Sequence, residues 1–306
     1  MDAMSQNRNV PLCIDLDGTL IATDTLWEGL ASVLIRRPWL FFAVIAWAIS
    51  GKAVLKREIA ARYVRTGAEW PYRSEVIERI RIARESGQPV WLVTGAAEST
   101  ANIIAGHLGL FDRVLHSTDS ENLTSRRKRE RLLSLCGDGG FDYAGNSRDD
   151  LAVFDAARRA IVVAPDRAAS RWARANEAEM LPLRKTSPLA ILKSIRVHQW
   201  LKNILIAVPL VLNHEFADFN LLLAAVAAFF SFSFLASAVY VVNDISDLAN
   251  DRLHPRKRLR PLAAGTVSIP VISATAAGLL LASIALASLL PPLFWGVLAL
   301  YALITT

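Results

Sequence analysis

The distribution of apolar residues along the chain changes near residue 187. Before that point, apolar residues come in short runs that end in acidic residues, glycine or charged segments, namely 10–14, 89–95 and 160–164. Runs of this length predict buried strands of an α/β domain. After that point the chain has four longer apolar runs, at about 200–213, 219–242, 268–290 and 293–306. The pattern therefore predicts an α/β domain followed by an all-α transmembrane domain.

The run 219–242 is long enough to cross a bilayer, which needs about 20 apolar residues. The preceding connection, 213–218, has no Lys or Arg, whereas 251–260 is rich in both. The positive-inside rule places 251–260, and with it the first domain, in the cytoplasm. We therefore predict a multi-pass protein of the cell (inner) membrane with a cytoplasmic N-terminal domain.

Composition supports the same division. The chain has 306 residues, is 53% hydrophobic and has a mean hydropathy of +0.32 with a formal charge of +6. It is too apolar for an ordinary soluble protein and too charged for a pure membrane bundle. The positive charge suits lipid headgroups and phosphorylated substrates, and no nucleic-acid-binding motif is present, so we expect no nucleic-acid partner. Cys13 and Cys136 have no framework spacing and are expected to be free thiols.

Two carboxylates follow the first predicted strand. Asp15 and Asp17 come directly after the run 10–14 and are followed by Gly18. A strand that ends this way places both acids at the carboxyl edge of a sheet, where open α/β folds bind their ligands. Asp15 has the chemistry to attack a phosphorus atom, and Asp17 has the chemistry to protonate a leaving group and then activate water.

The sequence Asp-Leu-Asp-Gly-Thr at 15–19 resembles the signature of the haloacid-dehalogenase-like hydrolases. The resemblance implies a Rossmann-like fold with a helical cap, here at about 20–86. It implies that Thr94 binds phosphate and that Lys128 neutralises it. It also implies a Mg²⁺ site in which Asp15 is joined by Asp149 and Asp150. We assign residues 1–187 to this domain and its linker, with a helix and then a linker over 165–187.

The sequence departs from that family at one position. Asn146 stands where the family usually has the first metal-binding Asp of its last loop. A neutral amide oxygen supplies less charge to Mg²⁺ than a carboxylate does. Two interpretations follow: a hydrolase that binds Mg²⁺ weakly, or a domain kept as a scaffold.

The cap contains an unusual apolar segment. Residues 39–49 have no polar side chain, and Arg or Lys residues flank them on both sides. The segment is too short to span a bilayer. It is either a buried cap helix or a segment that enters the membrane interface.

Phased carboxylates follow the second membrane run. Asp244, Asp247 and Asp251 are spaced three and then four residues apart, which places them on one face of a helix. Oxygen ligands of this kind suit Mg²⁺, which bridges to substrate phosphates. Arg and Lys residues, which suit phosphate oxygens, follow at Arg252, Lys257, Arg258 and Arg260. The stretch predicts a site for a diphosphate.

The motif Asn-Asp-x-x-Asp-x-x-x-Asp at 243–251 resembles the first acidic motif of the UbiA family of intramembrane transferases. In it Asn243 joins the three carboxylates. The segment that follows, which includes His254, is more similar to the branch that transfers phosphoribose to a polyprenyl phosphate. The resemblance implies that Lys202 and Asn203 line the substrate pocket; the alternative is that they only reach the membrane interface.

We therefore predict that a hydrolase-like domain is fused to a partial UbiA-like membrane domain at 188–306. The expected cofactor is Mg²⁺, and the expected partners are a phosphorylated small-molecule donor and a polyprenyl phosphate or diphosphate lipid. Prenyl transfer to another acceptor, a membrane-anchored phosphatase and a non-catalytic scaffold are the alternatives. The family's second acidic motif follows its fourth membrane helix. The fourth run here stops at Thr306, so we expect an inactive, truncated form of a longer enzyme.

Overall fold

The computed structural model describes residues 10–118, 122–181, 187–213 and 217–305. The chain divides into two compact units. The first comprises Met1–Lys185 together with Arg252–Pro255, and the second comprises Thr186–Asp251 and Arg256–Thr306.

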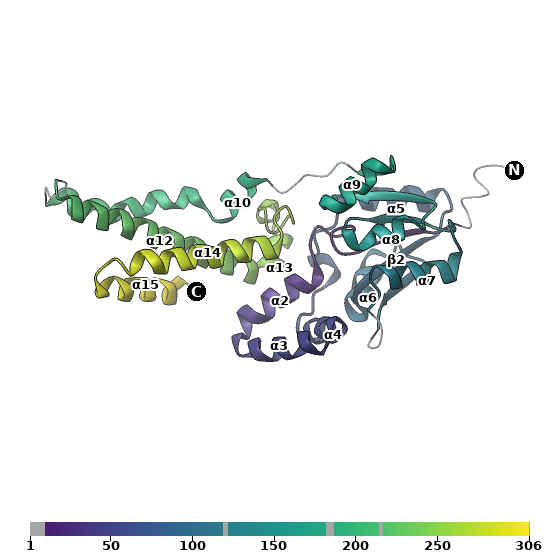
Figure 1. Cartoon of the computed structure of the whole chain (residues 1–306), viewed down its shortest axis with the longest axis horizontal. Coiled ribbons are helices and arrows are strands. Elements are labelled where there is room, and N and C mark those ends of the chain that lie inside the picture. The colour runs from purple at the N-terminus through teal and green to yellow at the C-terminus, as the bar shows by residue number, and fades with distance from the viewer. Residues whose placement is uncertain (1–9, 119–121, 182–186, 214–216, 306) are drawn as a thin grey trace. The chain divides into compact units, whose positions relative to one another are not determined.

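The first unit contains a six-stranded sheet in the order β3-β2-β1-β4-β5-β6, and every pair of neighbouring strands is parallel (Figure 1). The strands are β1 (Leu12–Ile14), β2 (Val90–Ala97), β3 (Arg113–Ser117), β4 (Asp142–Gly145), β5 (Arg159–Val163) and β6 (Glu179–Leu181). The chain begins with β1 at the centre of the sheet and adds β2 and β3 on one side. It then returns to the other side of β1 and adds β4, β5 and β6 there. This is the doubly wound arrangement, in which ligands bind where the strand order reverses. The predicted α/β fold is confirmed.

Helices cover both faces of the sheet because successive strand side chains point to opposite faces. Leu12, Ile14 and Leu92 pack with α5 (Ser74–Glu85) and α6 (Glu98–Leu108). Cys13 and Val93 pack on the other face with α7 (Arg126–Cys136), α8 (Leu151–Phe154) and α9 (Arg167–Ala175). Strands buried on both faces explain why the runs in the sequence are continuously apolar. Both cysteines are free thiols, as predicted.

The insertion after β1 forms a small helical cap of α2 (Thr25–Arg36), η1 (Pro38–Leu40), α3 (Phe41–Ser50) and α4 (Lys52–Arg62). Its own core is built around Val33, Val44 and Ile59, one residue from each α-helix. Val44 is the only residue of α3 that is buried. The interpretation of 39–49 as a buried helix is therefore wrong, because the cap is too thin to enclose α3. A short turn, η2 (Gly67–Glu69), then leads to α5.

Two edge strands were not predicted from the sequence. β3 reads Arg-Val-Leu-His-Ser and β6 reads Glu-Met-Leu, so neither is a continuous apolar run. β6 lies within 165–187, where a helix and then a linker were predicted; the helix is present as α9. Edge strands bury less surface than central strands, and their short, mixed sequences give little signal.

The second unit is helical. It begins with α10 (Pro188–Ser194), whose start is capped by the Ser187 hydroxyl, which accepts from the amide of Ala190 at 3.2 Å. It continues with η4 (Val197–Ala207), α11 (Val208–Leu212), α12 (Phe219–Ser246), α13 (Leu248–Leu253), η5 (Lys257–Leu259), α14 (Ile269–Ala287) and α15 (Pro292–Thr305). In the described residues α12 and α14 are each long and apolar enough to cross a membrane, in agreement with the predicted transmembrane domain. The run 200–213 forms η4 and α11 rather than one regular helix, and Pro209, which lacks an amide hydrogen, stands in α11.

The membrane helices pack around α12. Leu235 and Val239 contact Ala287 of α14 and Leu298 of α15. Ser231 and Ser283 exchange hydrogen bonds: each hydroxyl donates to the other residue's carbonyl, at 2.9 and 2.7 Å. Small hydroxyl residues at a contact let two helices approach closely and satisfy their own polar atoms inside an apolar bundle.

We predict that Leu92→Ala destabilises the hydrolase-like unit by about 2–5 kcal/mol, because it leaves a cavity in a fully buried part of the sheet. Cys13 is fully buried in β1, so its thiol reacts only when the sheet opens. In a Cys136→Ser background, the denaturant dependence of Cys13 labelling measures the change. Ile82→Ala, a truncation of an exposed aliphatic residue on α5, is the control and should shift the midpoint by much less.

Candidate functional site

The first site is built on the turn that follows β1. Asp15 leaves the strand, and its backbone amide donates to the carbonyl of Ala144 in the neighbouring strand β4. Gly18 has a φ of +75°, and a Cβ at this position would lie 2.1 Å from the side-chain nitrogen of Asn146. Glycine is required here because it alone permits both that φ and that contact. The turn therefore brings the Asn146 side chain directly over the loop that contains Asp15 and Asp17.

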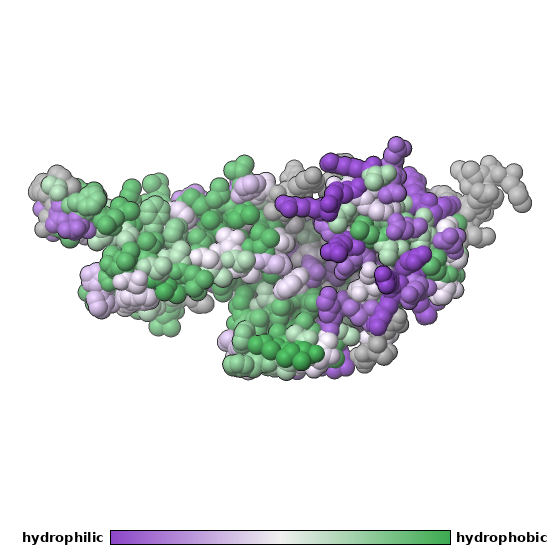
Figure 2. All heavy atoms as spheres, in the orientation of Figure 1, coloured by the Kyte–Doolittle hydropathy of each residue, from purple (hydrophilic) through white to green (hydrophobic). Residues whose placement is uncertain are grey.

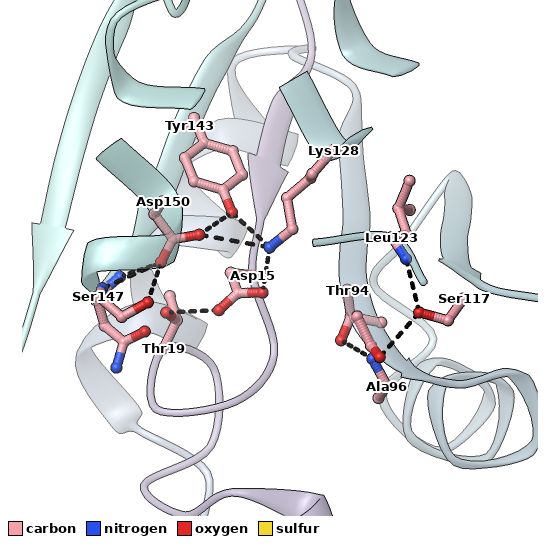
Figure 3. A network of polar contacts seen from close by, with 12 residues as sticks. Asp15, Thr19, Thr94, Ala96, Ser117, Leu123, Lys128, Tyr143, Ser147 and Asp150 are labelled. Carbon is pink, nitrogen blue, oxygen red and sulfur yellow. Dashed lines mark hydrogen bonds and ion pairs between the residues drawn. The ribbon is translucent and has the colours of Figure 1, made fainter. Parts of the chain in front are cut away.

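Lys128 organises the buried charges at this edge (Figure 3). It enters from the first turn of α7, and its Nζ lies 2.7 Å from Oδ1 of Asp15, 2.8 Å from the hydroxyl of Tyr143 and 3.4 Å from Oδ1 of Asp150. Tyr143 donates its hydroxyl to Asp150 at 2.6 Å. The structure thus brings together Asp15, Lys128 and Asp150, which are far apart in the sequence.

Burial and charge act against each other in this cluster. Burial lowers the pKa of Lys128, but Asp15 and Asp150 raise it by more, so the ammonium stays charged. Burial raises the pKa of Asp15 to about 6, with Lys128 opposing that shift. Burial also acts to raise the pKa of Asp150, but Lys128 and the hydrogen bond from Tyr143 reverse the direction and lower it. At neutral pH Asp15 is therefore an ionised carboxylate held against a cation, as a nucleophile requires.

Asp17 lies in a different environment. Its Oδ1 accepts a hydrogen bond from the backbone amide of Thr25, at 2.7 Å, at the start of the cap. Burial, and then the neighbouring Asp24, raise the pKa of Asp17 to about 8. The carboxyl therefore keeps a proton at neutral pH. Two nearby carboxyls with separated pKa values are the arrangement expected of a nucleophile and a general acid.

Thr94 ends the central part of β2, next to the edge where Asp15 leaves β1. Its hydroxyl oxygen accepts from the amide of Ala96 at 2.9 Å, which shapes the turn after the strand. The carbonyl of the next residue, Gly95, accepts from the hydroxyl of Ser117 at 2.9 Å (Figure 3). The Ser117 hydroxyl oxygen also accepts from the amide of Leu123, so the loops after β2 and β3 are tied together.

Two residues of this site were missed in the sequence. Tyr143 is a strand residue among apolar neighbours, and its type alone does not show that its hydroxyl binds Lys128 and Asp150. Lys56 reaches in from cap helix α4, where its Nζ lies 2.5 Å from the carbonyl of Gly95 and 3.1 Å from Oδ1 of Asn122. Burial lowers the pKa of Lys56, whereas Asp17 and Asp24 oppose that shift. Nothing in the sequence distinguishes Lys56 from the other cap lysines.

The predicted metal ligands occupy unequal positions. Asp150 is buried, and its Oδ2 accepts from the amides of Asn146 and Ser147 and from the Ser147 hydroxyl, so both of its oxygens are engaged by the protein. Asp149 is exposed on the outside of the same turn. Both oxygens of Asp15 also have partners, Lys128 at Oδ1 and the Thr19 hydroxyl at Oδ2, and the side-chain nitrogen of Asn146 lies nearer to Gly18 than its oxygen does. Asp15 and Asn146 offer Mg²⁺ the kinds of oxygen ligand that it accepts, although they provide one carboxylate instead of two.

The second site lies at the end of α12. Asp244 Oδ1 is 2.5 Å from a guanidinium nitrogen of Arg196 and 3.3 Å from one of Arg260. The same Arg260 nitrogen lies 2.6 Å from Oδ2 of Asp251, and Lys257 lies 3.6 Å from Oδ1 of Asp251. Arg260 therefore joins two carboxylates that are seven residues apart. Arg196, from the turn before η4, was not among the predicted site residues.

Asp247 is separated from this pair. It stands between α12 and α13 and is exposed, although the helical hydrogen bonds from its amide to Asn243 and from the Asp251 amide to its carbonyl are both kept at 2.9 Å. In the part of the chain that the structure describes, no three His, Cys, Asp or Glu side chains are arranged to hold a metal ion. The pair that could contribute to a cation site is Asp244 and Asp251. Oδ1 of Asp251 is buried and accepts no hydrogen bond among the described residues, and its nearest cation is the Lys257 ammonium at 3.6 Å, so it has room for a further ligand.

The other predicted residues of the second site are placed as follows. Asn243 donates its amide to the carbonyl of Thr305 at 2.9 Å. Asn203 donates to the hydroxyl of Ser233 at 2.9 Å, so it faces α12. Lys202 and Arg258 are exposed. Arg252 and His254 belong to the first unit, the former buried and the latter exposed.

Comparisons with known proteins agree with both halves of the chain. Residues 12–155 match the model of the haloacid dehalogenase-like hydrolases, and residues 204–306 match that of the UbiA prenyltransferase family. An uncharacterized protein, y4nM, of Sinorhizobium fredii is 39% identical over 267 residues, which are 86% of this chain and 51% of that protein. The chain therefore spans about half the length of that relative.

Two further relatives match shorter stretches of the chain. The decaprenyl-phosphate phosphoribosyltransferase of Corynebacterium glutamicum is 41% identical over 102 residues, covering 32% of this chain and 30% of that protein. The enzyme of the same name from Mycobacterium tuberculosis is 45% identical over 83 residues, covering 25% of this chain and 27% of that protein. The chain joins a domain of the haloacid dehalogenase-like hydrolases to a C-terminal region of the UbiA prenyltransferase family.

Proposed function

We propose that the chain belongs to a membrane transferase that takes a glycosyl group from a Mg²⁺-bound diphosphate donor and transfers it to a lipid phosphate. The observation that supports this proposal best is the cluster at the end of α12. There Asp244 and Asp251 stand beside Arg196, Lys257 and Arg260 in one unit. Carboxylates for a divalent cation next to cations for phosphate oxygens are what a diphosphate leaving group needs.

Two donor classes suit such a cluster. We favour phosphoribosyl diphosphate as donor and polyprenyl phosphate as acceptor, because relatives with 41% identity over 102 residues and 45% identity over 83 residues are named decaprenyl-phosphate phosphoribosyltransferases. Prenyl transfer from a polyprenyl diphosphate is the alternative, since the acidic residues serve either diphosphate. Mg²⁺, held by Asp244 and Asp251, would neutralise the leaving diphosphate. Arg196 and Arg260 would bind its oxygens, and α12 and α14 would exclude water from the cationic carbon.

We assign a second activity, phosphate-ester hydrolysis, to the first unit. Asp15 attacks the phosphorus and the ester bond breaks, while Asp17 donates its proton to the leaving alkoxide. Asp17 then takes a proton from the water that releases phosphate from Asp15. Lys128 and Thr94 bind the phosphoryl oxygens, and Tyr143 holds Lys128 in position. Mg²⁺ at Asp15 and Asn146 would supply further positive charge.

The proposed topology follows from charge. The segment 251–260 is basic and 213–218 lacks Lys and Arg, which favours a cytoplasmic acidic cluster and a cytoplasmic hydrolase domain in the inner membrane.

We predict that Asp15→Asn lowers the rate of phosphate-ester hydrolysis by at least about a thousandfold, because the amide is not a nucleophile. Initial rates of phosphate release by the purified chain with ribose 5-phosphate measure the effect. Asp138→Asn makes the same chemical change at an exposed position and should leave the rate unchanged. Equal rates for the two variants would rule out Asp15 as the nucleophile.

We also predict that Asn146→Asp lowers the Mg²⁺ concentration for half-maximal hydrolysis by about tenfold, since a carboxylate replaces a neutral ligand. The measurement is a Mg²⁺ titration of the rate. Asn176→Asp, which adds the same charge at an exposed site, is the control. The prediction is wrong if both variants keep the wild-type Mg²⁺ dependence.

For the membrane unit, we predict that Asp251→Asn weakens Mg²⁺-dependent binding of phosphoribosyl diphosphate by about tenfold or more. Titration calorimetry of the detergent-solubilised chain measures binding without requiring turnover. Glu177→Gln, a neutralisation at an exposed position of the other unit, should bind as the wild type does. Competition between phosphoribosyl diphosphate and a polyprenyl diphosphate for binding distinguishes the two donor classes. Equally tight binding of phosphoribosyl diphosphate without Mg²⁺ would contradict the proposed site.

A further inference from the structure

Helix α3 presents an apolar surface that the cap does not cover. Trp39 is 71% exposed, Phe42 is 78% exposed and Ile49 is 82% exposed, and Phe41 and Ile45 belong to the same surface. Figure 2 shows this surface as a continuous hydrophobic area over the position of α3 in Figure 1. Large aromatic and aliphatic side chains gathered on one helix are uncommon on a surface that faces only water.

Cations border this surface at both ends. Arg36 and Arg37 precede it, and Lys52 and Arg57 follow it on α4. Arg57 is paired with Glu58 at 3.0 Å and is itself exposed. An apolar face with basic borders matches the layered chemistry of a bilayer surface, where anionic headgroups lie above acyl chains.

The geometry of the two helices excludes a simple span. Helices Thr25–Arg36 and Pro38–Ser50 together are apolar enough for one, but the chain bends by 119° between them. The bend holds Trp39, Phe41 and Phe42 at the outer corner of the cap. A pair bent this sharply is not a straight transmembrane helix and suits a segment that enters the interface with its corner.

The catalytic domain has an opening beside the same cap. A pocket of about 620 Å³ is lined by residues of α4, of the start of α6 and of the loop after β3. Lys56 and Arg57 form its cap wall. Lys56 also contacts the carbonyl of Gly95, the residue after Thr94, so the pocket and the catalytic edge share a wall. Because α4 begins directly after Gly51, the wall of the pocket adjoins the apolar surface of α3.

We propose that α3 and the preceding turn enter the interface of an anionic bilayer, so that the hydrolase pocket takes a phosphate monoester at the head of a membrane lipid. The apolar corner holds the lipid side of the cap, and Lys56 and Arg57 meet the anionic headgroup above it. The reaction consumes water and a lipid phosphate monoester and yields inorganic phosphate and a lipid alcohol, with Asp15 and Asp17 acting as described above.

A lipid phosphate monoester as substrate would connect the hydrolase to the transferase. This connection rests on the proposed transferase function. Phosphoribosyl diphosphate has a phosphate monoester on carbon 5 that transfer from carbon 1 does not touch. A transferase that uses it therefore makes a lipid with a terminal phosphate monoester. The hydrolase of the same chain would consume that product, which makes it the second step of a two-step sequence at one membrane.

The experiment uses the full chain reconstituted in bilayers of phosphatidylcholine and phosphatidylglycerol. Hydrolysis of phosphatidic acid in the bilayer is compared with hydrolysis of ribose 5-phosphate in solution. We expect Phe42→Glu to lower the first rate by about tenfold and to leave the second unchanged. Val64→Glu, at a cap residue that is 73% exposed outside α3, should change neither. Equal losses for both variants, or no loss for Phe42→Glu, would overturn the proposal.

A second measurement does not depend on turnover. In a Cys136→Ser background, spin labels at Phe42→Cys and Val64→Cys are compared for collision with oxygen and with a water-soluble nickel chelate. We expect the label at position 42 to favour oxygen and the label at position 64 to favour nickel. A label at position 42 that favours nickel excludes lipid contact, and one shielded from both reagents indicates a protein surface, such as a second copy of the chain, instead. If the wild-type chain does not hydrolyse ribose 5-phosphate, the proposed hydrolase activity is wrong. The spin-label measurement still tests lipid contact in that case, because it does not depend on turnover.

Discussion

A single buried ammonium group determines how the first site works. Lys128 is 4% exposed and lies between Asp15 and Asp150, two carboxylates that could not both stay ionised at that depth without it. Its position requires the start of α7, the ends of β1 and β4 and the loop after β4 to meet at one point. The loop is fixed in turn by Asp150, which binds the amides of Asn146 and Ser147. Asp15, Lys128, Asp150 and the backbone amides of Asn146 and Ser147 are thus parts of one hydrogen-bonded unit.

In the second site, too, carboxylates removed from water need a nearby positive charge. Asp244 and Asp251 are balanced by the guanidinium groups of Arg196 and Arg260 rather than by a buried lysine. Arginine can bind a carboxylate and then a phosphate oxygen with the same planar group, because its charge is spread over several donors. In this cluster a cation that binds the carboxylates would release arginine for the substrate. The arrangement therefore suits a site that gathers its metal and its diphosphate together.

The cap has two chemically different sides. Its inner side supplies Lys56 to the catalytic edge, and its outer side exposes the apolar residues of α3. A hydrolase that acts only on small soluble esters has no need for such an outer side. A hydrolase joined to membrane helices gains from it, because its substrate is then limited to the plane in which those helices lie.

The sequence by itself determined the architecture. Continuous apolar runs predicted the strands β1, β2 and β5, and long apolar runs predicted α12 and α14, since both depend on local composition and length. The short central strand β4, which begins with Asp142, was not predicted. Short motifs in the sequence also identified Asp15, Thr94, Lys128 and the acidic stretch before Arg252. Tertiary structure decided what these residues touch. Tyr143, Lys56 and Arg196 joined the sites only because distant segments meet there, and Arg260 joins Asp244 to Asp251 while Asp247 stays exposed. Side-chain partners across a fold depend on packing between elements, which the periodicity of any one segment does not contain.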